Sequence, residues 1–314
     1  MVRPYQRCIV PERITGIVLD SANPHVGRRR GRPFSYPGRA ELLGGRQNPL
    51  HYVTAEGGRA HSYYLAKLAS KVSQLTGGMP ARRLAEIFDV ILVDEMQDLV
   101  GWDFSVLRVL AEAGFAQFEC VGDFRQTVYQ TSEASKRPQT SSEKLAEFQA
   151  IGFEVENLAI SWRCIQSICD LADLLHTAEG RYPRTESMLD GVPAQYCDHN
   201  GIYAVSDAHL DAYIEMYSPV ILRWSRAMRR ELCDGKVAYN FGEAKGLGFD
   251  RVLILPTDKH ARFLGGNASV FDDESSDDSK NKLYVGITRA RYSLAFSYSG
   301  GSLISGAQVW RPGY

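Results

Sequence analysis

The chain has 314 residues, of which 44% are hydrophobic and 23% charged, a composition typical of a globular protein with one large or two ordinary domains. A formal net charge of −1 excludes a strong whole-molecule attraction to nucleic acid, so any such binding must be local. No apolar run reaches the roughly 18 residues that span a membrane, and the N-terminus lacks the apolar segment of a signal peptide. We therefore expect a cytoplasmic protein without a membrane partner, in which the six cysteines, whose spacing matches no zinc site, are free thiols.

Residues 1–60 hold 8 of the 28 glycines and 6 of the 13 prolines, and we expect irregular structure there with a strand at 14–19. The densest basic run of the chain lies in this part and includes Arg28 and Arg30. Aromatic residues follow it, and a mixture of cations and aromatic rings can bind single-stranded nucleic acid. The alternative is an ordinary solvated loop.

Beyond residue 60, apolar residues recur at helical spacing or in short runs, which predicts alternating helices and strands. The expected helices of the first half are 61–75, 81–86, 104–111 and one ending at 150, with strands at 87–93 and 116–121 and a polar loop at 131–142. The expected strands of the second half are 153–159, 201–205, 219–223, 236–240, 251–255 and 293–297. Its expected helices are 161–175, 207–217, 225–233 and 282–290, with irregular segments at 176–200 and 271–279.

This alternation is typical of parallel α/β sheets. We expect two domains, one over residues 1–150 and the other over residues 151–314. No internal repeat of short period is visible in the sequence.

The candidate chemistry begins with residues 91–98, Ile-Leu-Val-Asp-Glu-Met-Gln-Asp, where an apolar strand ends in two adjacent carboxylates. Parallel sheets bind ligands at the carboxyl ends of their strands. Asp94 could therefore hold Mg²⁺ and Glu95 could orient an attacking water, the two acidic tasks of nucleoside-triphosphate hydrolysis. The alternative is a solvated acidic turn, but the next strand also ends in polar residues, Gly122 and Asp123.

Five stretches, residues 91–98, 121–129, 158–168, 242–250 and 283–291, together resemble motifs of superfamily 1 DNA helicases of the UvrD/Rep type, in the order of that family. The resemblance implies P-loop NTPase-type, RecA-like parallel sheets. The first RecA-like domain, over 1–150, would be incomplete, and the second, over 151–314, would be complete. It also implies ATP and Mg²⁺ as cofactors and single-stranded DNA as partner.

By the same resemblance, Asp94 would bind Mg²⁺ and Glu95 would activate water. Gln126 would sense the γ-phosphate. Arg163 and Arg289 would stabilise charge on the transferring phosphoryl group, a role that suits the forked donors of guanidinium. Without the resemblance, Arg163 could be a helix-capping residue and Arg289 a surface ion-pair partner.

The resemblance also implies that Lys245 and Gly246 bind the nucleotide and that Tyr129 stacks on a DNA base. The alternative for Tyr129 is a core tyrosine.

Two departures from the family pattern affect the nucleotide site. The chain contains no Gly-x-x-x-x-Gly-Lys-Ser/Thr, the loop that cradles phosphates. Gly248 stands where the family has a glutamate that contacts the sugar. We therefore expect that the isolated chain binds ATP weakly and that a partner protein must supply the P-loop half.

Three functions follow as hypotheses. The first is a portion or subunit of an ATP-dependent, 3′–5′ type DNA helicase, active only with a P-loop partner. The second is a catalytically inactive helicase-like adaptor that binds DNA or protein in DNA repair or antiphage defence. The third is a metal-dependent nuclease built on Asp94, Glu95 and Asp98.

Overall fold

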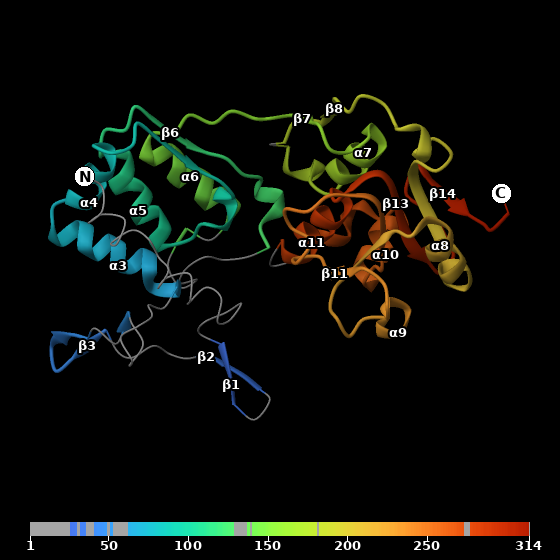
Figure 1. The fold of residues 1–314 in the computed structure, drawn as a ribbon, viewed down its shortest axis with the longest axis horizontal. Helices are drawn as coiled ribbons and strands as arrows, with labels where there is room; N and C mark the ends of the chain where they lie inside the picture. Colours follow the sequence, from blue (N-terminus) through green and yellow to red (C-terminus); the bar gives the residue numbers. More distant parts are fainter. Residues whose placement is uncertain are drawn as a thin grey trace. The chain divides into compact units, whose positions relative to one another are not determined.

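The structure, a computed structural model, describes residues 26–29, 32–35, 41–48, 51–52, 62–128, 137–138, 140–180, 182–272 and 277–313 (Figure 1). The described chain forms two compact units, with the final crossing between Val155 and Glu156. Residues up to Phe124 and from Arg137 to Val155 form unit 1, whereas Arg125–Val128 and the chain from Glu156 form unit 2. The predicted strand at 14–19, Arg30 and Tyr129 lie outside the described residues, and of Arg28 only the backbone is described.

The described part of unit 1 contains two short hairpins, four α-helices and one pair of parallel strands. The hairpins lie in a part that we expected to be irregular. Its elements are β1 (Val26–Arg29), β2 (Arg32–Ser35), β3 (Leu42–Leu43), β4 (Arg46–Gln47), α3 (Ser62–Leu75), α4 (Met79–Ala85), β5 (Val90–Val93), α5 (Trp102–Ala111), β6 (Gln117–Cys120) and α6 (Ser141–Ile151).

The parallel pair β5–β6 is packed on one face. Phe118 of β6 contacts Phe153, which contacts Phe148 of α6, and Phe148 packs edge-to-face on Phe104 of α5. The residues that alternate with this face, including Leu92, are exposed. Edge-to-face ring packing therefore holds the strand pair, and the acids that follow β5, against the helices.

Unit 2 is built on a six-stranded, wholly parallel sheet with the strand order β11-β10-β12-β13-β9-β14. The sheet strands are β9 (Gly201–Ser206), β10 (Val220–Arg223), β11 (Ala238–Asn240), β12 (Phe249–Ile254), β13 (Ala290–Tyr298) and β14 (Ala307–Trp310), and a separate short pair is β7 (Ile160–Ser161) with β8 (Glu186–Ser187). The helices are α7 (Gln166–Leu174), α8 (Leu210–Tyr217), α9 (Arg230–Cys233), α10 (Asp258–Leu264) and α11 (Asp278–Ile287).

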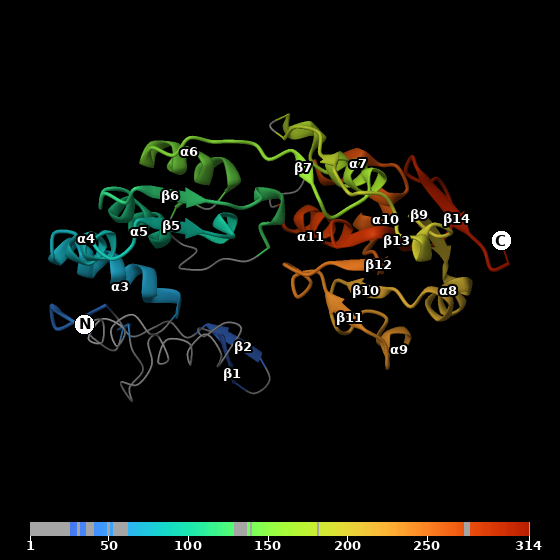
Figure 2. The same cartoon turned by 45° about the horizontal axis from the view of Figure 1, so that its top comes forward.

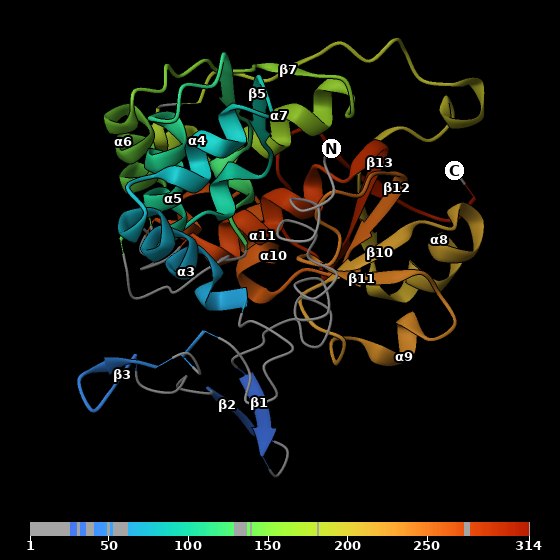
Figure 3. The ribbon, with the colours of Figure 1, turned by 60° about the vertical axis from the view of Figure 1, so that its left-hand side comes forward.

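Helices cover both faces of this sheet (Figures 2 and 3). On one face α7, α10 and α11 bury Ile168, Phe263 and Leu283 against β12 and β13. On the other face α8 and α9 bury Tyr213 and Cys233 against Leu253 and its neighbours. A central parallel strand is apolar on both sides, which explains why these strands read as continuous apolar runs in the sequence.

The structure differs from the sequence-based elements at several places. The strand predicted at 153–159 is absent. Val155 and Leu158 are exposed there, and the two-residue strand β7 begins only at Ile160. Helix α10 was not predicted, and of the helix predicted at 225–233 only α9 forms. Helix α11 begins within the acidic run that we expected to be a loop, because acidic side chains in a first helical turn interact favourably with the helix dipole.

None of the helices in the described part of the chain is long and apolar enough to cross a membrane. The predicted mixed α/β architecture with parallel sheets is present.

His260 of α10 lies fully buried in unit 2 among the rings of Trp224, Phe241 and Phe271. Its Nε2 lies 3.1 Å from the Ser279 carbonyl oxygen, and its Nδ1 has no hydrogen-bond partner among the described residues. Burial, with a smaller contribution from the nearby Lys282, lowers the pKa of His260 from 6.5 to about 4. The folded chain therefore holds this imidazole neutral under conditions in which the unfolded chain protonates it.

Acid should consequently destabilise unit 2 between pH 6.5 and pH 4. In this window the unfolded chain binds more protons, so the free energy of unfolding falls as the pH decreases. A gap of about 2.5 between the two pKa values (6.5 minus 4) corresponds to roughly 3 kcal/mol. The substitution His260→Phe removes the hydrogen bond to Ser279 and should lower the free energy of unfolding by about 1 kcal/mol at neutral pH. It should also make the free energy of unfolding depend less on pH.

Urea unfolding from pH 7 to pH 4 measures this effect. His199, whose pKa burial also lowers to about 4, keeps part of the dependence in the variant. His209→Phe, at a half-buried ring beside Trp310, is the matched control. An identical pH slope in His260→Phe and the parent chain would contradict the assignment.

Candidate functional site

In unit 1, the two carboxylates lie immediately after β5 and are exposed. Glu95 has a φ of 56°, in the left-handed region that non-glycine residues rarely adopt. The Asp94 carboxylate accepts a hydrogen bond from the Glu95 backbone N–H at 2.7 Å. A left-handed backbone conformation at a residue such as Glu95 costs on the order of 1–3 kcal/mol and persists only where neighbouring contacts hold it.

Gln97 supplies those contacts. Its side chain is buried, donates from Nε2 to the Glu95 carboxylate and accepts the Asp123 N–H through Oε1 at 3.0 Å. It therefore joins the ends of β5 and β6, which our sequence reasoning placed at one edge without identifying the residue between them. A Cβ on Gly122 would lie 2.2 Å from the Gln97 Oε1, so only glycine fits beside this bridge.

A second buried group fixes the same turn from the opposite side. Lys144 of α6 has no exposed surface, and its Nζ donates to the Gln97 carbonyl oxygen. This arrangement of Asp94 and Asp123, the carboxylate frame, is thus held by the side chains of Gln97 and Lys144. Gln97 lies within the 91–98 stretch without an assigned role, whereas Lys144 carries no sequence signal beyond a polar residue in a partly apolar surrounding.

The acids do not form a metal cluster by themselves. Within the described residues, no three His, Cys, Asp or Glu side chains lie where they could hold a metal ion together. The nuclease hypothesis needs Asp94, Glu95 and Asp98 to converge on a metal ion, and the structure does not bring these three carboxylates together in that way. Mg²⁺ in phosphoryl-transfer sites is commonly held by one or two carboxylates and the phosphates, a role that Asp94 alone could fill.

In unit 2, Gln126 and Arg289 are hydrogen-bonded, the Arg289 Nη2 donating to the Gln126 Oε1 at 3.1 Å. The two residues are 163 positions apart in the sequence. Arg289 lies at the end of α11, and Gln126 reaches it because Arg125–Val128 packs as part of unit 2. The structure therefore joins the predicted phosphate sensor to one of the two predicted arginines.

Arg289 is buried, which contradicts a surface ion pair. Besides Gln126, its guanidinium donates to the carbonyl oxygens of Leu247 at 2.9 Å and Val285 at 3.2 Å, and to the Thr288 hydroxyl at 3.2 Å. A buried charge requires such bonds, because leaving one unpaired in the interior costs several kcal/mol.

Arg163 and Arg291 approach the same turn. A Cβ on Gly248 would lie 3.8 Å from the Arg163 side chain and 3.6 Å from the Arg291 Nη2. Arg291 is paired with Asp250 at 3.0 Å. The hydrogen bond from the Tyr196 hydroxyl, together with Arg291, keeps the pKa of Asp250 below its usual value. The half-buried guanidinium of Arg163, in contrast, has no ion-pair partner among the described residues.

Cations thus gather around residues 247–248, where the glutamate of the helicase pattern is absent. Because no side chain extends from Gly248, the arginine donors nearby are not neutralised by a carboxylate at that position. Such a group of guanidiniums can bind a phosphate-type anion.

Lys245 and Gly246 lie in the turn before β12. Gly246 has a φ of 80° and open space around its Cβ position, so glycine serves the turn conformation here and no close approach is required within the protein. Nucleotide binding by these two residues remains a prediction.

The carboxyl end of β10 carries a feature that we did not anticipate. Trp224 follows the strand and is 37% exposed, and the Lys282 ammonium lies 4.2 Å from its ring centroid. Connections from neighbouring strands β10 and β12 leave toward opposite ends of the sheet, which marks a ligand-binding position in open parallel sheets. An exposed aromatic ring beside a cation suits a nucleic-acid base and its phosphate.

No protein-family model matches the chain. No curated protein matches it either. Among solved structures, it is similar to Arterivirus nonstructural protein 10, a helicase, in complex with DNA, at 16% identity and a TM-score of 0.36 over 66% of this chain and 38% of that chain.

It is also similar to the C-terminal domain of a possible DNA helicase from Lactobacillus plantarum WCFS1, at 16% identity and a TM-score of 0.30 over 48% of this chain and 98% of that domain. A third similar structure is the PRRSV nsp10 helicase, at 20% identity and a TM-score of 0.26 over 66% of this chain and 35% of that chain. The chain spans little more than a third of the two nonstructural proteins. At such TM-scores these likenesses alone establish neither fold family nor function.

Removing the Gln97 bridge should destabilise unit 1. Gln97→Ala leaves the Asp123 N–H without its acceptor and removes the support of the strained Glu95, at a cost of about 1–3 kcal/mol. Gln117→Ala, on an exposed glutamine of β6, is the matched control and should change stability by less than about 0.5 kcal/mol. Urea unfolding followed by circular dichroism measures both, and equal effects would refute the bridge.

Proposed function

We propose that the chain is a nucleic-acid-binding unit of a superfamily 1 helicase of the UvrD/Rep type, which contributes all but the P-loop to an ATP site. The observation that carries the proposal is the hydrogen bond between Gln126 and Arg289. Two segments that resemble helicase motifs, distant in sequence, meet through the two side chains to which the resemblance assigns phosphate-directed roles. A chance match of short motifs does not require such a meeting.

The roles are those that the resemblance assigns, and the chemistry of each side chain suits them. Asp94 would hold Mg²⁺, and Glu95, kept in place by Gln97, would orient the attacking water. Arg163, without a carboxylate partner in the described residues, meets the phosphoryl oxygens, and Arg289 contributes once it exchanges an internal acceptor for phosphate. Gln126 senses the phosphate because its side chain accepts a hydrogen bond from the same Arg289 guanidinium.

The nucleotide and nucleic-acid contacts complete the proposal. Lys245 and Gly246 lie beside the nucleotide. Single-stranded DNA stacks on Trp224, with Tyr129, Arg28 and Arg30 as further contacts, and translocation runs 3′–5′ as in the family.

A non-enzymatic adaptor is the second candidate, and one specific observation favours it. Arg289 is 1% exposed and its donors are engaged by protein acceptors. A guanidinium in this state stabilises the fold of unit 2 without any nucleotide. In an adaptor the same contacts would serve only to keep a DNA- or protein-binding surface rigid.

Hydrolysis assays separate the two candidates. The chain alone should show no steady ATPase activity, because no P-loop lysine or hydroxyl is present in its sequence. A mixture with the polypeptide that carries the P-loop should hydrolyse ATP, faster with single-stranded DNA, and Glu95→Gln should reduce the rate by about 10²–10⁴-fold. Glu112→Gln, an exposed acid of unit 1, is the control.

Two results would count against the proposal. Steady ATPase activity of the chain alone that Glu95→Gln abolishes would refute the need for a P-loop partner. Hydrolysis by the mixture that survives Glu95→Gln would refute the catalytic role of Glu95 and favour the adaptor.

Binding of single-stranded DNA tests the Trp224 surface. Loss of one stacked base corresponds to about 1–3 kcal/mol, so Trp224→Ala should weaken binding of a labelled oligothymidylate by roughly 5–150-fold. Fluorescence anisotropy at fixed salt measures the affinity. Trp162→Ala, at an even more exposed tryptophan, is the control, and equal losses in the two variants would refute a specific role for Trp224.

A further inference from the structure

The four residues Arg125–Val128 belong to unit 2, although the chain on both sides of them belongs to unit 1. Asp123, two residues before Arg125, is bonded through its N–H to Gln97 in unit 1. Phe124 alone separates the two attachments. Along the chain, Arg125–Val128 is therefore the first segment of unit 2, and it follows the end of β6 in unit 1.

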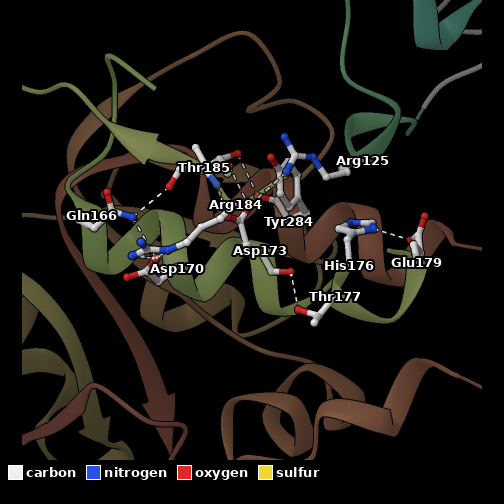
Figure 4. Close-up of polar contacts among 11 residues, drawn as sticks. Arg125, Gln166, Asp170, Asp173, His176, Thr177, Glu179, Arg184, Thr185 and Tyr284 are labelled. Carbon is white, nitrogen blue, oxygen red and sulfur yellow. Dashed lines mark hydrogen bonds and ion pairs between the residues drawn. The ribbon is translucent and has the colours of Figure 1, made fainter. Parts of the chain in front are cut away.

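Arg125 attaches this segment to unit 2 through three groups (Figure 4). Its Nη1 lies 3.2 Å from the Asp173 carboxylate of α7. Its guanidinium carbon lies 4.7 Å from the ring centroid of Tyr284 and 5.0 Å from that of Tyr182. With 13% of its side chain exposed, the guanidinium is largely removed from water, which strengthens both the ion pair and the cation–π contacts.

The groups that receive Arg125 are fixed by unit 2 itself. Asp173 accepts the Thr185 N–H at 2.6 Å and the Thr185 hydroxyl at 2.8 Å. Thr185 is held in turn, because its carbonyl oxygen accepts from Gln166 at 3.0 Å, and the neighbouring Arg184 pairs with Asp170 at 2.8 Å. These residues form one connected network in Figure 4. A carboxylate held in this way presents a prepared acceptor to Arg125.

Helix α11 sets the register of the whole segment. Asn281 donates from Nδ2 to the Thr127 carbonyl oxygen at 3.1 Å, and Tyr284, one turn later, stacks on Arg125. Arg289, directly after the helix, donates to Gln126. Three successive residues of the segment thus contact α11 and the residues just after it, and two of the contacting residues, Asn281 and Tyr284, have the i, i+3 spacing that aligns side chains on one helix face.

We propose that Arg125 is a positioning residue that holds residues 125–128 on α11 and thereby keeps Gln126 against Arg289. Arg125 lies within the 121–129 stretch, but the resemblance assigns it no role, and it acts through Gln126 without touching a reacting group. The inference rests on the proposed function for its catalytic consequence but not for its structural content. It makes Arg125 the residue that keeps the segment with Gln126 packed within unit 2.

Hydrogen exchange of the free 314-residue chain tests the structural content. Arg125→Ala should raise exchange in the peptide covering residues 122–128 by at least about tenfold, while peptides of β12 and β13 stay unchanged. Arg125→Lys keeps the charge and should restore part of the protection. Arg226→Ala, which removes an exposed arginine paired with Glu243 in the same unit, is the matched control and should have no effect on this peptide.

A double-mutant cycle identifies the anchor. If Arg125 acts through Asp173, the variants Arg125→Ala and Asp173→Asn should be non-additive in the exchange of this peptide. Additive effects, or unchanged exchange in Arg125→Ala, would overturn the inference. A global loss of protection would be recognised in β12 and β13, and the milder Arg125→Lys then decides by its partial effect on residues 122–128 alone.

The catalytic consequence has a separate readout. In the mixture that hydrolyses ATP, Arg125→Ala should lower kcat by about 10–100-fold with KM for ATP within about twofold, and Arg125→Lys should recover part of kcat. Unchanged kcat would overturn the positioning role. If the parent mixture hydrolyses no ATP, the proposed function fails, whereas the exchange experiment still decides whether Arg125 anchors the segment.

Discussion

The guanidinium of Arg289 is the group on which the arrangement of unit 2 depends. A buried cation is tolerated only when its donors are engaged, and here the acceptors come from three places in the chain: the turn at Leu247, the last turn of α11 and Gln126. Moving any one of them leaves a charge poorly compensated. The three segments must therefore keep one geometry together.

The α/β character of unit 2 could be predicted because its strands are buried on both faces and read as apolar runs between helical patterns. The strands near 201–205 and 219–223 agree closely with β9 and β10. The strand predicted at residues 153–159 was wrong because the same sign, a run with apolar residues, was used there. Val155 and Leu158 are apolar, but they lie in an exposed connection, and apolar spacing carries no information on whether a neighbouring strand exists. The start of α11 was missed because acids were taken as a sign of a loop, although they also favour a first helical turn.

The candidate site divides in the same way. Gln126, Arg163 and Arg289 could be selected from the sequence because their motifs resemble a known pattern, whereas the bond between Gln126 and Arg289 could not. Gln97 and Arg125 lie within stretches that resemble helicase motifs, but sequence reasoning assigned them no role, and Lys144 lies outside every such stretch. Each acts through partners far along the chain, such as Lys144 on the Gln97 carbonyl, so only the folded structure shows what it does.

The carboxylate frame bears on the choice between an enzyme and an adaptor. Glu95 is held in a left-handed conformation by Gln97, and a residue without Cβ is required at Gly122 to leave room for that glutamine. A solvated acidic turn would relax to an unstrained backbone, since nothing on the exposed surface prevents it. The strain and its buried support instead place the Glu95 carboxylate at a defined position beside the end of β6. Such placement serves a group that must meet a ligand, which is the physical reason to prefer the catalytic half-site over a purely structural remnant.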